Sequence, residues 1–149
     1  MSEQRGSRWL TFKILASGLG VVSGCVAFPV FTFLYGNISA GVWAGLSVII
    51  SLMVLHLHLL YRNLRLERWH TGHSLAATRN LGLLTLTAGS VASFYYLYNH
   101  VANHEEMFPI SDSSLIAMVW SMMCVKWGLA LAWSAHRYKQ SLDSEYSLI

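Results

Sequence analysis

Long stretches of this chain contain no charged residue. No Asp, Glu, Lys or Arg lies between Lys13 and Arg62, and none lies between Arg79 and Glu105. A helix that crosses a bilayer needs about 20 mostly apolar residues, so the first stretch is long enough for two helices. Tyr35-Gly36-Asn37 divides them, because Gly and Asn favour a turn. The pattern predicts four membrane spans, near residues 14–35, 39–61, 80–99 and 114–135.

The composition points to the same class of protein. Hydrophobic residues make up 54% of the 149 positions and charged residues 11%, against about 25% charged residues in a soluble domain. Such a chain cannot cover itself with a polar surface, which excludes a soluble enzyme, a disulfide-stapled secreted module and a disordered chain. Lipid offers the backbone no hydrogen-bond partners, and the alternation typical of membrane strands is absent from the sequence. We therefore expect an all-α integral membrane four-helix bundle, a single domain over residues 1–149, without enzymatic activity.

The basic residues set the expected orientation. Nine of the ten Lys and Arg residues lie before the first predicted span, between the second and third, or after the fourth. Basic residues stay on the cytosolic side of a membrane. Both termini, the loop 62–79 and the tail 140–149 are therefore predicted to be cytosolic. The net charge of +3 then follows from membrane topology, and no nucleic-acid partner is expected.

Three local patterns concern turns and packing. Pro29 should kink the first helix without ending it, because apolar residues continue beyond it. Gly20-xxx-Gly24 and Gly41-xxx-Gly45 place small residues on one helix face, which we interpret as close packing within the bundle. Asn37-Ile38-Ser39 has the form of a glycosylation sequon, but its turn is short and we expect the nearby bilayer to prevent modification.

A few polar residues break the apolar pattern of the spans. Lys126 lies near the middle of the fourth span, where an ionisable group must be neutral, solvated by polar groups, or paired with an arriving anion. His56 and His58 point about 200° apart on a helix, so one should face the bundle and the other the lipid or a neighbour. His100 and His104 share a face if their helix continues, a spacing that can hold a metal ion; alternatively they belong to a solvated acidic loop.

The fourth span carries further residues of interest. Trp120 and Trp127, seven residues apart, lie on one face with Lys126 beside it. His136, Arg137 and Tyr138 follow at the cytosolic boundary, where an aromatic belt with basic flanks is the simpler interpretation. Together these types suit haem, because His and Tyr ligate iron and Lys or Arg pairs with carboxylates. Histidines at three levels of the bundle suggest a relay of ligands across the membrane.

The same segment carries a family resemblance. Val119-Trp120-Ser121, Lys126-Trp127 and Ala135-His136-Arg137-Tyr138, in this spacing, resemble the HRG (haem-responsive gene) family of small four-span haem transporters. The resemblance implies that haem is the transported substrate, moved from the endolysosomal lumen or the cell exterior to the cytosol. It implies haem contacts by a second-span histidine, a loop histidine and the C-terminal motif. Those residues are His56 or His58, with His56 favoured, His100 or His104, with His100 favoured, and His136, Arg137 and Tyr138.

The last residues of the chain predict a subcellular location. Tyr146-Ser147-Leu148-Ile149 matches a tyrosine-based sorting signal, in which Tyr146 and Ile149 would be read by clathrin-adaptor-type machinery. We expect a multi-pass protein of the endosome or lysosome membrane, with some at the plasma membrane. One bundle of this size is small for enclosing haem, so a homo-oligomer is expected.

Two other functions remain open at the level of sequence. A copper or other metal-ion permease could use the thioethers of Met118 and Met122, which share one helix face. A tetraspan trafficking or adaptor protein would transport nothing and would leave Lys126 without a role. His70 and His73, in the cytosolic loop, are interpreted as surface residues.

Overall fold

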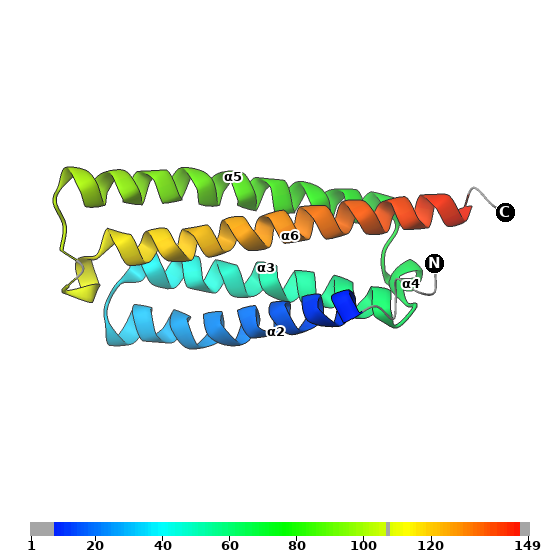
Figure 1. Ribbon diagram of the computed structural model, residues 1–149, viewed down its shortest axis with the longest axis horizontal. Helices are drawn as coiled ribbons and strands as arrows, with labels where there is room; N and C mark the ends of the chain where they lie inside the picture. Colours follow the sequence, from blue (N-terminus) through cyan, green and yellow to red (C-terminus); the bar gives the residue numbers. More distant parts are fainter. Residues whose placement is uncertain (1–7, 107, 147–149) are drawn as a thin grey trace.

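The computed structural model describes residues 8–106 and 108–146 of the chain. Four of the described helices are long and apolar enough to cross a membrane, and they run side by side along the molecule (Figure 1). The prediction of an all-α four-helix membrane bundle is therefore confirmed. The elements are α2 (Arg8–Pro29), the π-helix η1 (Val30–Leu34), α3 (Ile38–Arg62), α4 (Leu66–Trp69), α5 (Gly72–Ala102), the 3-10 helix η2 (Ile110–Asp112) and α6 (Ser114–Tyr146).

The helices pack in a fixed spatial order. α2 packs against α3, α3 against α6, and α6 against α5, which is the order seen across Figure 1. Both ends of the described chain and α4 lie at one end of the bundle, as an even number of spans requires. We call this the basic end, because Lys13, Arg62 and Arg137 lie there, and we call the opposite end the outer end. By the distribution of basic residues, the basic end is predicted to be cytosolic.

The helices extend beyond the spans expected from hydrophobicity. α5 begins at Gly72, well before the predicted boundary at residue 80, because Thr71 caps it: the Thr71 hydroxyl accepts a 3.2 Å hydrogen bond from the Ser74 amide. α6 continues to Tyr146, so most of the predicted 140–149 tail is helical. Residues 147–149 and the Tyr146 side chain, and with them the predicted sorting signal, lie outside the described part of the structure.

The turn between the first two spans lies where the sequence predicts it. Gly36 has a φ of 70°, which favours glycine, and Asn37 then caps α3 by accepting a 2.9 Å hydrogen bond from the Ala40 amide. The Asn37 side-chain amide donates to the carbonyl oxygens of Ile110 (2.8 Å) and Ser113 (3.1 Å). This buried amide ties the turn to the segment before α6. It is therefore engaged in the fold, which argues against glycosylation more directly than proximity to the bilayer does.

The first helix continues past its proline. Beyond Pro29 the backbone forms one π-helical stretch, closed by a 3.0 Å hydrogen bond from the Tyr35 amide to the Val30 carbonyl. The expectation that Pro29 does not end the helix is confirmed.

Glycines allow the helices to approach one another closely. A Cβ atom on Gly82 of α5 would lie 2.6 Å from the Ala132 backbone nitrogen of α6. A Cβ on Gly24 would lie 2.6 Å from Val48 of α3, and one on Gly20 would overlap the Trp127 ring of α6. The small residues of the first span are thus used for packing within the bundle, as predicted.

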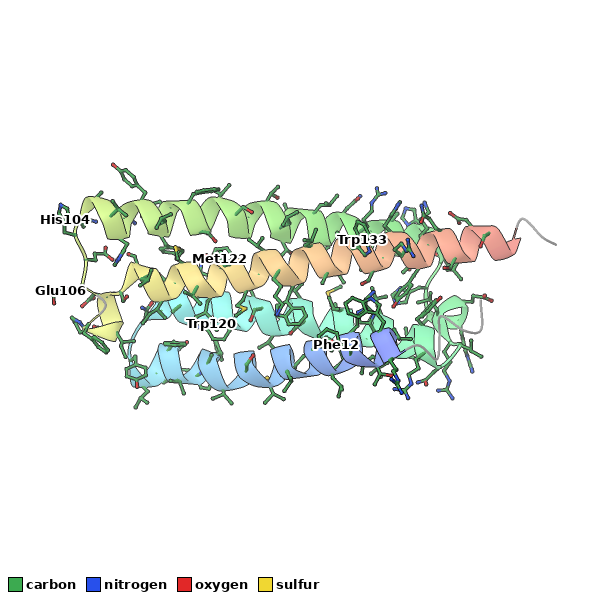
Figure 2. The ribbon with its side chains drawn as sticks, viewed as in Figure 1. Phe12, His104, Glu106, Trp120, Met122 and Trp133 are labelled. Carbon is green, nitrogen blue, oxygen red and sulfur yellow. The ribbon has the colours of Figure 1, made fainter. Side chains whose placement is uncertain are left out.

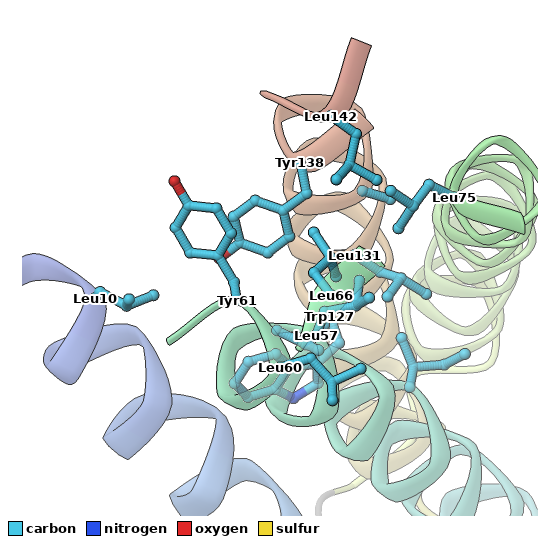
Figure 3. Packing of buried hydrophobic residues seen from close by; sticks show 13 residues of the cluster. Leu10, Leu57, Leu60, Tyr61, Leu66, Leu75, Trp127, Leu131, Tyr138 and Leu142 are labelled. Atoms are coloured by element: carbon cyan, nitrogen blue, oxygen red, sulfur yellow. The ribbon is translucent and has the colours of Figure 1, made fainter. Parts of the chain in front are cut away.

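The central helices α3 and α6 provide most of the core. In the most apolar segments of α3 and α6, 39% of residues are buried, against 11% in α2 and α5. A cluster of buried apolar residues gathers toward the basic end, where Leu57, Leu131 and Tyr138 pack together with Leu10 from α2 and Leu75 from α5 (Figure 3). The outer helices therefore present long apolar surfaces outward, as expected of helices in contact with lipid.

Candidate functional site

A cavity opens at the basic end of the bundle, bordered by α2, α3 and α6. Its volume of about 570 Å³ falls within the range of about 300–1,000 Å³ that is typical of small-molecule sites. Because it opens where both ends of the described chain lie, a ligand in it would be exposed to the predicted cytosolic side. This basic-end cavity is lined by Trp9, Leu10, Lys13, Tyr61, Trp133, Ser134, Arg137, Tyr138, Gln140, Ser141 and Ser144.

Tyr138 and Tyr61 form the buried floor of this cavity, and Tyr138 also bonds to His58 of α3, which does not line the cavity itself. A 2.6 Å hydrogen bond joins the Tyr138 hydroxyl oxygen to Nδ1 of His58, and the Tyr138 ring stacks on Tyr61 with centroids 4.2 Å apart and planes 11° apart (Figure 3). The bond links residues 80 positions apart in the sequence. The structure therefore brings together His58 and Tyr138, two of the predicted site residues.

His56, the histidine favoured from the sequence, lies elsewhere. Its side chain is exposed and does not line the basic-end cavity. Its ring instead lies beside those of Trp69 and His70, with centroid distances of 6.3 Å and 6.0 Å. The expectation that one of the two α3 histidines faces the bundle and the other faces outward is met, with His58 as the inward residue.

The side chains of His136, Arg137 and Tyr138, the C-terminal motif, point in different directions. Consecutive helical residues point about 100° apart, so Arg137 lines the cavity, Tyr138 points into the bundle, and His136 is exposed outside the cavity. Arg137 and Lys13 border the same cavity from α6 and α2. None of the described residues that line the cavity is acidic, so the site favours an anionic group.

Two aromatic–basic pairs face this cavity, and of their four residues sequence reasoning singled out only Arg137. Trp9 and Lys13 are four residues apart on α2, with the Lys13 ammonium 5.7 Å from the Trp9 ring centroid. Trp133 and Arg137 are also four residues apart, on α6. Residues at this spacing share a helix face. The spacing could have identified both pairs, but membrane flanks and aromatic belts explained the same residues.

Trp120, Lys126 and Trp127 lie earlier in α6, away from the basic end. The two tryptophans pack within the bundle. Trp127 is buried against Gly20 of α2, and the Trp120 ring lies edge-on to Phe31, with centroids 6.1 Å apart. The Lys126 side chain is exposed, and its ammonium lies 4.6 Å from the Trp127 ring centroid, within cation–π range. None of the three lines the basic-end cavity.

The outer end does not form the histidine pair that a continuous helix would create. α5 ends at Ala102, and His104 has a positive φ of 48°, so the helix does not continue to His104 and the condition for a shared helix face is not met. The His100 Nδ1 atom is buried and has no hydrogen-bond partner among the described residues. His104 and Glu106 project at this end of the molecule (Figure 2).

Glu105 has a structural role at the same end. Its carboxylate accepts a 3.0 Å hydrogen bond from the Ser114 amide at the start of α6. Hydrogen bonds from Ser114 hold the pKa of Glu105 below its usual value. Within the described residues, no group of three or more His, Cys, Asp or Glu side chains is arranged to hold a metal ion.

The two ends are well separated. Ser114 and Tyr138 lie about 36 Å apart along α6, from a rise of about 1.5 Å per residue over 24 residues.

The remaining candidate metal ligands, the sulfur-containing side chains, are dispersed. Met118 is half-buried and Met122 is exposed on α6. Cys124 is buried and donates its thiol to the Trp43 carbonyl at 3.3 Å.

No protein-family model matches the sequence, and no solved structure matches the fold.

Proposed function

We propose that this protein is a haem transporter that delivers haem to the cytosol through the basic-end cavity. The observation that carries the proposal is the hydrogen-bonded Tyr138–His58 pair beneath a cavity flanked by Lys13 and Arg137. This arrangement combines iron-ligating side chains, cations and aromatic walls in one place.

Each part of the cavity suits one part of the haem molecule. Tyr and His are protein ligands of haem iron. Lys13 and Arg137 offer cations for the two propionates, and Arg binds carboxylates through paired hydrogen bonds. The rings of Trp9 and Trp133 offer flat apolar surfaces for the porphyrin. A simple metal cation would gain nothing from the two positive charges, which argues against the basic-end cavity as a metal-ion site.

The direction and compartment of transport complete the proposal. Haem would enter at the outer end, near His100 and His104, and leave at the basic end, with transient rather than permanent ligands. The endosome or lysosome membrane, with cycling through the plasma membrane, is the proposed location. A homo-oligomer is part of the proposal, because the Lys126 ammonium is exposed at mid-span and an exposed charge there needs a polar neighbour.

Haem titration of the purified full-length protein in detergent tests the proposal. Arg137→Ala should weaken haem binding by about 10- to 150-fold, because a hydrogen bond to a charged group contributes about 1.5–3 kcal/mol. Tyr138→Phe should shift the Soret band by removing the phenol. Arg62→Ala and Tyr98→Phe are matched controls, since both side chains are exposed and neither lines the cavity; they should bind haem like the wild type.

A second comparison separates His58 of α3 from His136 of α6. His58→Ala should change the haem spectrum, whereas His136→Ala should not, because His136 lies outside the cavity. Haem uptake by cells that cannot synthesise haem should follow the same order. If the wild-type protein produces no Soret shift, the proposal fails and a trafficking or adaptor role without a substrate is favoured.

A further inference from the structure

The basic-end cavity has a polar side that the proposed haem site does not use. One face of α6 lines it with polar side chains at intervals of three or four residues, namely Arg137, Gln140, Ser141 and Ser144. Polar surface makes up more than half of the lining. Haem needs cations, iron ligands and flat apolar walls, so a row of hydroxyl and amide groups points to a second kind of ligand.

Two cations face this cavity from different helices. Lys13 of α2 and Arg137 of α6 lie close enough for their charges to repel each other, and none of the described lining residues is acidic. The preference of basic residues for the cytosolic side explains where these residues lie along their helices, but not why they face one cavity. An anion bound between them removes the repulsion, and two cations match a headgroup that carries more than one negative charge.

The cavity is open toward the lipid. Its described lining comes from α2, α3 and α6 alone, and α2 and α6 both pack on α3, so no described helix closes the cavity opposite α3. Trp133 lies one turn, about 6 Å, nearer the membrane centre than Arg137, and its side chain is exposed. Along α6 the lining therefore changes from polar to charged to apolar toward the bilayer. The polyol, phosphates and acyl chains of a phospholipid follow the same order.

We propose that the basic-end cavity binds the phosphorylated inositol headgroup of a phospholipid in the cytosolic leaflet. Lys13 and Arg137 bind the phosphates, since both residue types bind phosphate oxygens. Basic pockets between spans on the cytosolic side are known sites for such headgroups. The lipid site stands on the cavity alone, and only its competition with haem rests on the proposed function.

The polar face of α6 selects the inositol ring. Gln140 is exposed in the cavity and offers an amide that can donate and accept. The Ser141 hydroxyl donates to the Arg137 carbonyl at 3.3 Å, so its lone pairs accept from a ring hydroxyl. The headgroups of phosphatidylserine and phosphatidylcholine have no free hydroxyl groups to pair with these side chains.

Native mass spectrometry of the full-length protein in detergent, titrated with short-chain phosphatidylinositol bisphosphate, tests the proposal. The wild type should bind one such lipid per chain, at least about tenfold more tightly than phosphatidylserine. Lys13→Ala and Arg137→Ala should each weaken binding by about 10- to 150-fold, the loss of a hydrogen bond to a charged group, and Gln140→Ala by about 2- to 10-fold. Arg62→Ala is the matched control, because this exposed arginine lies at the same end but outside the cavity; it should bind the lipid like the wild type.

Three outcomes overturn the proposal. Unchanged lipid binding in Lys13→Ala and Arg137→Ala, with wild-type helical content by circular dichroism, overturns the site. Equal affinity for phosphatidylserine overturns the choice of headgroup. Free inositol trisphosphate lacks acyl chains and should bind at least about tenfold more weakly; equal affinity for it overturns the lipid as the source of the headgroup.

The lipid and haem proposals fail in different ways. Tyr138→Phe removes a phenol that the lipid site does not use, so it should shift the Soret band and leave lipid affinity unchanged. Gln140→Ala should weaken lipid binding and leave the Soret band in place. Lipid binding by a wild type that shows no Soret shift overturns only the haem proposal. Equal lipid affinity with and without bound haem overturns the shared cavity.

Discussion

The hydrogen bond between His58 and Tyr138 makes a quantitative prediction about how α3 and α6 are held together. Tyr138→Phe removes one hydroxyl group and keeps the ring that stacks on Tyr61. His58→Leu removes the imidazole. The double variant replaces the polar pair by two apolar side chains, so a double-mutant cycle isolates the contribution of the hydrogen bond.

The structure places this bond at the strong end of its class. Hydrogen bonds between helices in membrane bundles contribute about 0.6 kcal/mol on average and about 1.7 kcal/mol at most. The bond is 2.6 Å long, and His58 and Tyr138 are only 2% and 7% exposed, so water cannot replace either partner. We expect a coupling free energy of about 1.5 kcal/mol, and a loss of about 1–3 kcal/mol for Tyr138→Phe alone, since that variant leaves a buried ring nitrogen unpaired.

The assay is reversible unfolding by sodium dodecyl sulfate in mixed micelles, followed by circular dichroism, for the wild type and the three variants. Trp43 and Tyr96 supply the control cycle, because their hydrogen bond also joins two spans but is 3.3 Å long and only partly buried. The control should couple by no more than about 0.6 kcal/mol. A His58–Tyr138 coupling below about 0.3 kcal/mol, or one equal to the control, refutes the reasoning.

Two further predictions concern the outer end. Asn37→Ala should lower the free energy of unfolding by about 1–3 kcal/mol, because it removes the α3 cap and the two bonds to the segment before α6; Ser39→Ala, which also destroys the sequon, should leave the stability unchanged in the same assay. The Glu105 cap should protect the Ser114 amide from hydrogen exchange above the ordinary glutamate pKa of about 4.3. Because the pKa of Glu105 is lowered in the folded protein, protection should fall only as the pH drops through that lowered value. Glu105→Gln should show no such loss; a Ser114 protection factor that is independent of pH in the wild type contradicts this role of the cap.

Much of the fold follows from the hydrophobic pattern of the sequence and from the lipid that surrounds the helices. Apolar stretches long enough to cross a bilayer form helices there because lipid cannot satisfy exposed backbone groups. The turn at Gly36 and the shared end of both termini follow from the same pattern. The helix boundaries do not, since hydrophobicity reports on the lipid layer while caps decide where a helix starts. Thr71 begins α5 well before the apolar stretch does.

The residues of the candidate site were harder to predict from the sequence than the fold. Sequence pattern identified His58, Arg137 and Tyr138, but it favoured His56 over His58 and also included His136; the structure places His56 and His136 outside the basic-end cavity. Two histidines two positions apart on one helix cannot be ranked without knowing how that helix is rotated. The rotation depends on how α3 packs against α2 and α6, which involves glycines and side chains far away in the sequence.

The sequence by itself thus determined that the chain is a four-span membrane protein, because hydrophobicity, charge asymmetry and turn propensity act over short distances along the chain. Only the tertiary structure decided which polar side chains meet. It paired His58 with Tyr138 and His56 with His70, although neighbouring positions offered the same chemistry. The physical reason is that a side chain's partner depends on the direction in which a packed helix holds it, and packing is a property of the whole bundle.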